Sequence, residues 1–242
     1  MEWRDEGVIL SMRPHGESAA IIEVFTRDHG RHAGVVRGGT SRRMAAHVQP
    51  GTQVAVVWTA RLAEHIGAYT VEPVRSRAHV LSDRLALAGL SSACALSLMA
   101  LPEREPIGPL WQATVAVLDA LAVPDWPAAY LRWELVLLQE LGFGLDLASC
   151  AVTGARDGLS FVSPKTGRAV SLAAAGDWAD RLLPMPRGLA GTGPLTPDAV
   201  LQGLAITAHF LTREMANLHP DRRFPEARGR LVDLLTRQAS AP

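Results

Sequence analysis

The sequence predicts an α+β protein: an N-terminal five-stranded OB-fold β-barrel, followed by an α-helical bundle with an inserted, zinc-ribbon-like β element. Three observations lead to this prediction. The first eighty residues contain short segments rich in Val and Ile, separated by turns with Gly or Pro. From Ser82 the apolar residues recur with a helical period. Residues 150–174 have the outline of a zinc ribbon, with two short apolar strands joined by a Ser-Pro-Lys-Thr-Gly-Arg turn.

The barrel prediction depends on turn signals that divide the first eighty residues. Gly or Pro occurs in each of four turns, which centre on residues 15, 29, 39 and 50. The strands expected between and around them are Gly7–Arg13, Ala19–Thr26, His32–Arg37, Thr52–Thr59 and Leu62–Val74. A five-stranded barrel with a basic turn between its second and third strands is compatible with an OB-fold, whose strand 2–3 face commonly carries nucleic acid.

The helices are expected where capping residues precede an apolar stripe. Ser82-Asp83 can cap a helix that Pro102 ends, and Thr196-Pro197 can open the long helix Asp198–Leu218. Asp125 is expected to cap a third helix, which ends at Gly142. This third helix is expected over Pro127–Leu141. The remaining expected helices are Pro109–Leu121, Ala173–Leu183 and about Pro225–Gln238, with a loop over Pro184–Pro197.

The composition is that of a globular protein without a membrane span. The chain has 242 residues, 48% of them hydrophobic and 20% charged, and its net charge is zero. It has no uninterrupted apolar run of the roughly 18 residues that a membrane helix needs, and its N-terminus is acidic where a signal peptide would be basic. Two cysteines, Cys94 and Cys150, fit a reducing compartment. The sequence therefore predicts a cytoplasmic protein.

The sequence offers little for catalysis. The Gly-rich stretch 188–193 follows no strand and precedes Pro194, so it does not predict a dinucleotide site. His29 and His32 are expected to form a solvent-exposed polar pair beside Arg27 and Arg31. We therefore expect no enzyme and no cofactor.

Arginines gather in two places that could bind phosphate. Between Arg27 and His47 there are five arginines against one acid, with a Gly-rich loop between them. A second cluster surrounds Phe224-Pro225, where helix capping and ion pairs to Glu226 and Asp233 are the alternative role. The candidate nucleic-acid-binding residues are Arg27, Arg31, Arg37, Arg42, Arg43, Arg222, Arg223, Arg228 and Arg230. The bland alternative for the first group is a surface loop that binds nothing.

Three aromatic residues share one face of an expected helix. Trp126, Tyr130 and Trp133 are spaced by four and three residues, which is a single helical face. We expect them in the core, although the same face could also form a groove for a partner peptide.

Three segments, in order along nearly the whole chain, resemble the bacterial recombination-repair mediator RecO family. GVILSMRPHGESAAIIEVFTRDHGRHAGVVRGG (7–39) resembles its N-terminal signature, with Gly16-Glu17-Ser18 in one turn and Phe25 to Gly30 in another. LLQELGFGLDLASCAVTG (137–154) is similar to its leucine-rich helix and ribbon start. HFLTREMANLHPDRRFPEARGRLVDLL (209–235) resembles its C-terminal helices, with Arg222, Pro225 and Arg228 in the closing motif.

The resemblance implies a DNA repair and homologous recombination mediator. Such a protein binds single- and double-stranded DNA, anneals complementary strands, and acts with RecR and single-stranded-DNA-binding protein to load RecA. The runner-up is a protein-interaction adaptor whose OB barrel does not itself bind DNA. The expected domains are an OB-fold domain (1–80), a helical domain (81–147 and 173–242) and a ribbon-like insertion (148–172).

The ribbon departs from the family's four-cysteine pattern. Zinc would need thiolates at Cys150, Thr153, Ser171 and Ala174, and only the first position has one. We therefore expect a metal-free ribbon, held by burial of Leu159, Phe161, Val162 and Val170.

Overall fold

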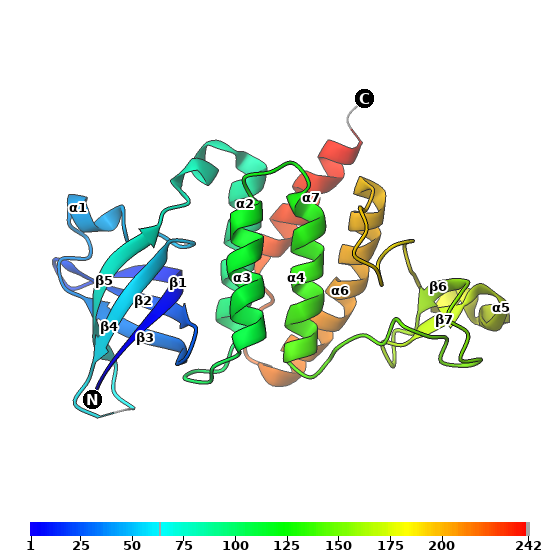
Figure 1. The fold of residues 1–242 in the computed structure, drawn as a ribbon, viewed down its shortest axis with the longest axis horizontal. Coiled ribbons are helices and arrows are strands. Elements are labelled where there is room, and N and C mark those ends of the chain that lie inside the picture. The colour runs from blue at the N-terminus through cyan, green and yellow to red at the C-terminus, as the bar shows by residue number, and fades with distance from the viewer. Residues whose placement is uncertain (63, 241–242) are drawn as a thin grey trace. The chain divides into compact units, whose positions relative to one another are not determined.

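The computed structural model describes residues 1–62 and 64–240. The chain divides into two compact units, Met1–Val123 (unit 1) and the residues from Pro124 onward (unit 2). Figure 1 shows the barrel of unit 1 and the helices and ribbon of unit 2. The first two long helices therefore belong to the same compact unit as the barrel, whereas the sequence placed a domain border near residue 80.

Unit 1 begins with a closed barrel, which confirms the predicted OB-fold. Its strands are β1 (Glu2–His15), β2 (Ala19–Thr26), β3 (Gly30–Val36), β4 (Gln53–Thr59) and β5 (Gly67–Arg75), in the order β1-β2-β3-β5-β4. β1 is longer than predicted because it serves two neighbours: residues 2–8 pair with β4 and residues 7–15 with β2. All pairs are antiparallel except β3–β5. The predicted fifth strand included residue 63, which lies outside the described residues.

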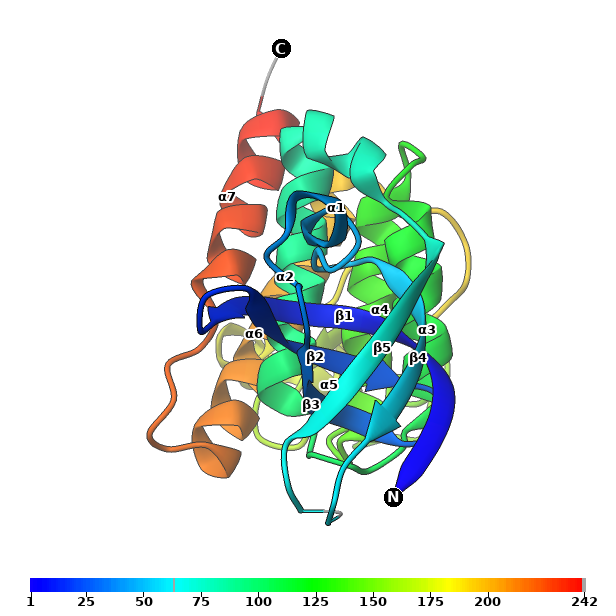
Figure 2. The same ribbon diagram turned by 90° about the vertical axis from the view of Figure 1, so that its left-hand side faces the viewer.

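The barrel lumen is filled by apolar side chains. Ile22, Val24, Val36, Val54 and Trp58 are among its buried residues. The predicted loop after β3 contains a one-turn helix, α1 (Arg42–Ala45), whose Met44 packs against this core. Figure 2 shows α1 at one end of the barrel, opposite the N-terminus.

The outer face of β1 and β2 is also buried. Because Ile22 and Val24 point into the lumen, their neighbours Ile21 and Phe25 point outward, yet they are only 7% and 0% exposed. Helix α2 (Arg84–Ala100) packs on β1, and its Cys94 thiol donates a weak hydrogen bond to the Ile9 carbonyl. As predicted, Asp83 caps this helix, accepting from the backbone N–H groups of Leu85 and Ala86.

An arginine–aspartate cluster joins the end of β5 to α3 (Gly108–Ala120). Arg77 follows β5 and precedes the short 3-10 helix η1 (Ala78–Ser82). It donates to Asp119 Oδ1 at 2.5 Å and to the Gly51 carbonyl at 2.7 Å, and Arg75 also pairs with Asp119. Burial would raise the pKa of Asp119, but the hydrogen bonds from the two arginines outweigh it and lower this pKa. The carboxylate therefore stays charged and holds α3 in unit 1.

Unit 2 is built on α4 (Trp126–Glu140), α6 (Pro197–Leu218) and α7 (Glu226–Ala239). Thr196 caps α6 by accepting from the Ala199 N–H, as predicted. Asp125 stands at the N-cap position of α4 but makes no side-chain capping hydrogen bond. Trp126, Tyr130 and Trp133 are all buried, which confirms their expected place in the core.

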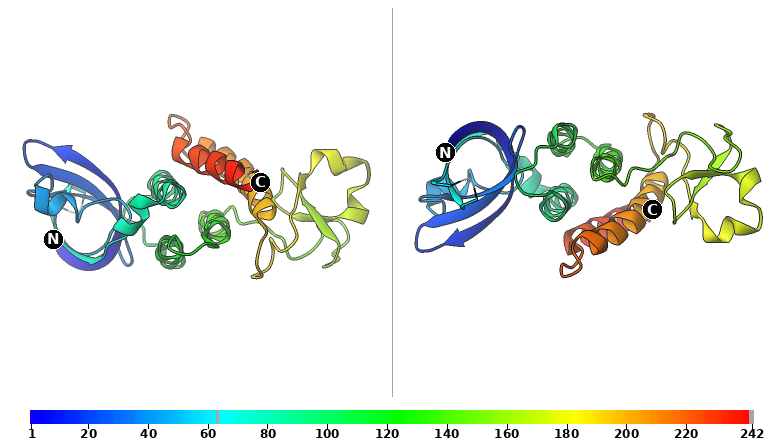
Figure 3. Two further views of the ribbon diagram at one scale, coloured as in Figure 1. Left: turned by 90° about the horizontal axis from the view of Figure 1, so that it is seen from above. Right: turned by 90° about the horizontal axis from the view of Figure 1, so that it is seen from below.

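The ribbon is a small three-stranded sheet within unit 2. Strands β7 (Ala169–Ser171) and β8 (Leu183–Pro184) flank β6 (Leu159–Val162). The helix predicted over Ala173–Leu183 is instead a one-turn helix, α5 (Leu172–Ala175), a 3-10 helix, η2 (Gly176–Arg181), and β8. Gly176 at the junction has φ +47°, a left-handed conformation that interrupts a regular helix. Figure 3 shows the ribbon to one side of α6 and α7.

No helix among the described residues is long and apolar enough to cross a membrane.

Two glycine substitutions test whether residues 101–107, which follow α2, pack closely against the turn between β2 and β3. Gly30 (φ +71°) and Gly16 (φ +61°) share a left-handed backbone, but a Cβ on Gly30 would lie 2.3 Å from the Glu105 carbonyl oxygen, whereas one on Gly16 would touch nothing. Gly16→Ala should cost about 1–2 kcal/mol in the free energy of unfolding. Gly30→Ala should cost about 1–3 kcal/mol more, measured by urea unfolding. Equal costs for the two substitutions would contradict this close packing.

Candidate nucleic-acid interface

The strand 2–3 face, where OB-folds commonly bind nucleic acid, is occupied by the protein itself. Arg31 points outward from β3 but is only 7% exposed. Its guanidinium donates to the Leu101 carbonyl at 3.0 Å and to Glu23 at 2.7 Å. Arg31 therefore has a structural role, and we remove it from the predicted phosphate contacts because a buried, paired guanidinium cannot reach a strand in solution.

The other arginines of the first cluster lie at two ends of the barrel. Arg27 precedes β3, whereas Arg37, Arg42 and Arg43 follow it. Seven residues of β3 at about 3.3 Å each separate the two groups by roughly 20 Å. The sequence run that looked like one patch is thus divided by a strand.

Hairpin pairing adds an arginine and a histidine to the group beside α1. His15 pairs with Ala19, and Ala20 pairs with Val36, so Arg13 and His15 lie at the same end as Arg37. The Thr40 N–H donates to the Ser18 carbonyl at 3.1 Å, which joins the two loops. We call Arg13, His15, Arg37, Arg42 and Arg43 the basic rim. Sequence reasoning missed Arg13 and His15 because their proximity depends on strand register.

The basic rim is exposed and has no internal counter-charges. All five side chains are exposed, and Glu17 is the one acid in segments 13–18 and 37–47. None of the five forms an ion pair with any residue in 1–62 or 64–240. Ser41 caps α1 by accepting from the Met44 N–H, which fixes Arg42 and Arg43 on one turn. Such a cationic, unpaired surface suits the phosphates of a nucleic acid.

The opposite end carries a stacked aromatic cluster rather than a cationic one. His29 Nδ1 lies 2.8 Å from Asp5 Oδ2, and its ring stacks on Trp3 with centroids 4.1 Å apart. His32 is buried edge-on against Trp3 and Trp58, and burial lowers its pKa to about 4. The predicted solvent-exposed histidine pair is therefore wrong for His32, which belongs to the barrel interior. Arg27 is exposed and pairs with Asp28 at 3.1 Å.

The C-terminal arginines also divide by burial. Arg228 is 5% exposed and donates to both carboxylate oxygens of Glu134, at 2.8 and 2.9 Å, and to the Leu204 carbonyl at 2.7 Å. Arg228 therefore connects α7 to α4 and α6, and we remove it from the predicted phosphate contacts. Arg222, Arg223 and Arg230 are exposed, and Arg230 lies 3.4 Å from Glu226, as the alternative role anticipated.

Two arginines on one helix test this division. Arg228→Ala leaves the fully buried Glu134 carboxylate without its partner, so it should lower the free energy of unfolding by about 3–5 kcal/mol. Arg230→Ala, in an exposed pair on the same helix, should change it by less than about 0.5 kcal/mol. The comparison is made by denaturant unfolding of the two variants, and a similar loss in both would refute a core role for Arg228.

The ribbon's residues do not fit a zinc ion. The Cys150 sulfur accepts hydrogen bonds from the Ser171 N–H at 3.3 Å and the Ser171 hydroxyl at 3.4 Å. These bonds and those from Thr153 lower the pKa of the Cys150 thiol to about 6. Hydroxyl groups thus face the sulfur from two of the three positions that lack a thiolate. No group of three or more His, Cys, Asp or Glu side chains in the described part of the chain could share a metal ion. The metal-free ribbon stays a prediction.

Elemental analysis tests it directly. We expect the purified protein to contain much less than one zinc per chain, and EDTA to leave its melting temperature unchanged, because no structural metal contributes to its folding. Refolding with added zinc serves as the control against metal loss during purification. One tightly held zinc per chain would overturn the prediction.

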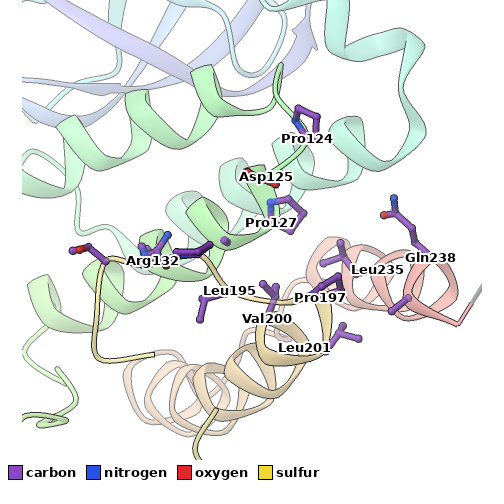
Figure 4. A pocket seen from close by; sticks show the side chains of 15 residues that line it. Pro124, Asp125, Pro127, Arg132, Leu195, Pro197, Val200, Leu201, Leu235 and Gln238 are labelled. Carbon is purple, nitrogen blue, oxygen red and sulfur yellow. The ribbon is translucent and has the colours of Figure 1, made fainter. Parts of the chain in front are cut away.

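Unit 2 contains a groove lined mainly by apolar residues. It has a volume of about 510 Å³ and lies among the N-terminal ends of α4 and α6, the C-terminal part of α7 and residues 192–195. Figure 4 shows apolar side chains around it, with Arg132 at one side. Arg132 donates to the Gly193 carbonyl, and its Nε has no partner among the described residues. The groove therefore combines apolar walls with one incompletely paired guanidinium.

An OB-fold barrel with an exposed basic rim is typical of a nucleic-acid-binding protein. The family of the chain follows from comparison with known proteins. The family model described as "Recombination protein O N terminal" matches residues 1–77, and the one described as "Recombination protein O C terminal" matches residues 81–223.

Relatives of nearly the same length carry the name DNA repair protein RecO. One from Cereibacter sphaeroides is 64% identical over 237 residues, which is 98% of this chain and 99% of that protein. One from Ruegeria sp. is 56% identical over 240 residues, covering 98% of this chain and all of the relative. One from Jannaschia sp. is 55% identical over 239 residues, 98% of each chain. The chain belongs to the RecO family of DNA repair proteins, and this membership supports a role in DNA repair and recombination.

Proposed function

We propose that this protein is a recombination mediator that binds single- and double-stranded DNA through the basic rim and anneals complementary strands. The observation that carries the proposal is the rim itself: four exposed arginines and His15 on two joined segments, in which Glu17 is the one acid. Guanidinium groups suit phosphate oxygens because they donate two parallel hydrogen bonds.

The mechanism we propose is non-catalytic. Arginines that neutralise phosphates release condensed counterions, so the affinity falls steeply with salt and depends little on base sequence. The outward Ile21 and Phe25 of β2 are buried and Arg31 of β3 is paired within the protein, so little of the strand 2–3 face is open to bases. Contacts at the rim would then hold the backbone and leave the bases free to pair with a complementary strand, which is what annealing requires.

The exposed C-terminal arginines Arg222, Arg223 and Arg230 form a second predicted contact, and Arg27 an outlying one. Membership of the family supports cooperation with RecR and single-stranded-DNA-binding protein in loading RecA, in the cytoplasm. These partners are part of the proposal. The groove beside Arg132 suits a short partner segment with apolar side chains and a carboxylate.

That groove also favours the second candidate function, a protein-interaction adaptor that does not itself bind DNA. In this reading the basic rim docks an acidic protein segment, and the DNA role comes through partners. The two functions differ in one requirement, because only the mediator must bind naked oligonucleotide with a salt-dependent affinity.

Salt-dependent binding of a labelled single-stranded oligonucleotide decides between them. Fluorescence anisotropy of Arg42→Ala/Arg43→Ala should show weaker binding than the natural sequence, and the slope of log affinity against log salt should be shallower by about 1.4, at about 0.7 per lost phosphate contact. Arg84→Ala/Arg237→Ala, at two exposed arginines outside both predicted contacts, is the matched control for removing two charges and should change the slope less. No binding by the natural sequence at low salt would favour the adaptor.

A further inference from the structure

One tryptophan on the ribbon stands apart from the chain's other aromatic residues. Trp178 is 63% exposed, whereas Trp58, Trp111, Trp126 and Trp133 are each at most 9% exposed. Trp3 is half-buried, and all Phe and Tyr side chains in residues 1–62 and 64–240 are buried or half-buried. An exposed indole offers a partner a large flat ring together with a polar N–H group.

The ribbon core fixes this side chain in its outward position. Ala179 and Leu182 pack against the cluster of Cys150, Val170 and Ala175, so the segment that carries Trp178 is anchored on both sides. Within unit 2, Figure 3 shows α5 and the adjoining segment on the side of the ribbon away from α6. The ring therefore projects from a rigid support and is not part of a loose loop.

A guanidinium is paired with the same ring. The Arg181 Cζ atom lies 4.9 Å from the centroid of the Trp178 ring, which is a cation–π geometry. Arg181 is itself exposed and makes no ion pair with any described residue. An aromatic ring with an adjacent free guanidinium is the combination that binds unpaired bases without sequence preference, since every base has a π-face and a nearby phosphate.

We propose that Trp178 stacks on a base of single-stranded DNA, with Arg181 held beside it to contact the adjacent phosphate. This inference rests on the proposed DNA-binding function and adds a base contact to it. It also separates two kinds of binding: the basic rim contacts backbone in either form of DNA, whereas Trp178 requires an unpaired base.

The charges around the ribbon suit an anionic partner, and the exposed ring beside Arg181 favours a nucleic acid among such partners. Residues 148–190 carry five cations, Arg156, Lys165, Arg168, Arg181 and Arg187, against three aspartates, and Arg168 pairs with Asp146. Two of the three aspartates, Asp177 and Asp180, flank Trp178 and repel phosphate. Removing their charge should therefore strengthen single-strand binding if the strand passes here.

The ring of His29, the other candidate for stacking on a base, is less suitable. His29 already stacks on Trp3, and its Nδ1 is engaged by Asp5. Its surroundings include Asp28, Glu103 and Glu105, whose charges disfavour a phosphate backbone.

The test compares single- and double-stranded oligonucleotides of one sequence, by fluorescence anisotropy, for Trp178→Ala and Trp178→Phe. Loss of one stacked base should weaken single-strand binding by roughly 5- to 150-fold in Trp178→Ala, with double-strand binding changed less than about twofold. Trp178→Phe should recover most of the loss because it keeps a ring. Leu172→Ala, at a residue 65% exposed in the same ribbon, is the matched control and should bind both forms normally.

Each outcome bears on a different claim. Unchanged single-strand binding in Trp178→Ala, with the natural protein binding DNA, would overturn the stacking contact but leave the proposed function standing, and would point to a protein partner for this surface. Equal weakening for both DNA forms would also overturn it. Absence of DNA binding by the natural protein would remove the proposed function itself. Asp177→Asn/Asp180→Asn should tighten single-strand binding, and no change there would place the strand elsewhere.

Discussion

The burial of the outer face of β1 and β2 is the constraint on which unit 1 depends. Val8, Ile21 and Phe25 point away from the lumen and are almost completely buried. Each such side chain stabilises the fold by about 1.5–3 kcal/mol when fully covered, which is comparable with a large share of a domain's net stability. Separation of α2 from this face would remove that contribution to stability. The outer face of these two strands is therefore committed to folding, which leaves the exposed basic rim as the candidate binding surface of the barrel.

Arginine has two roles in this protein, and burial separates them. Arg31, Arg77 and Arg228 are each at most 7% exposed, and each donates to a carboxylate and to a backbone carbonyl. A buried charge is tolerated only with such complete pairing. The arginines of the basic rim lack counter-charges, so their hydrogen-bonding groups remain in water and available. The same residue type thus holds the fold in one setting and can bind phosphate in the other.

The sequence predicted elements well where the signal is local. The caps Asp83 and Thr196 and the strand Ala19–Thr26 follow from residues within a few positions of each other, and each agrees with the structure. The candidate site was harder to predict. Arg228 bonds to Glu134, 94 residues away, and the place of Arg13 depends on the register of a hairpin. Neither relation leaves a local pattern, so a list of arginines could not separate the buried from the exposed.

The ribbon shows why shape and chemistry must be read separately. Its turns and strands follow from glycines and apolar residues, which remain when ligands are lost, and so the outline was recognisable from sequence. The Ser171 hydroxyl now bonds to the Cys150 sulfur, and the Ala175 and Val170 side chains fill the adjoining core. This packing, together with the sheet, holds the segments that carry the ribbon's outward side chains. Because the core packing fixes Ala179, the neighbouring Trp178 can be exposed without being mobile, which lowers the entropy lost when a partner stacks on it.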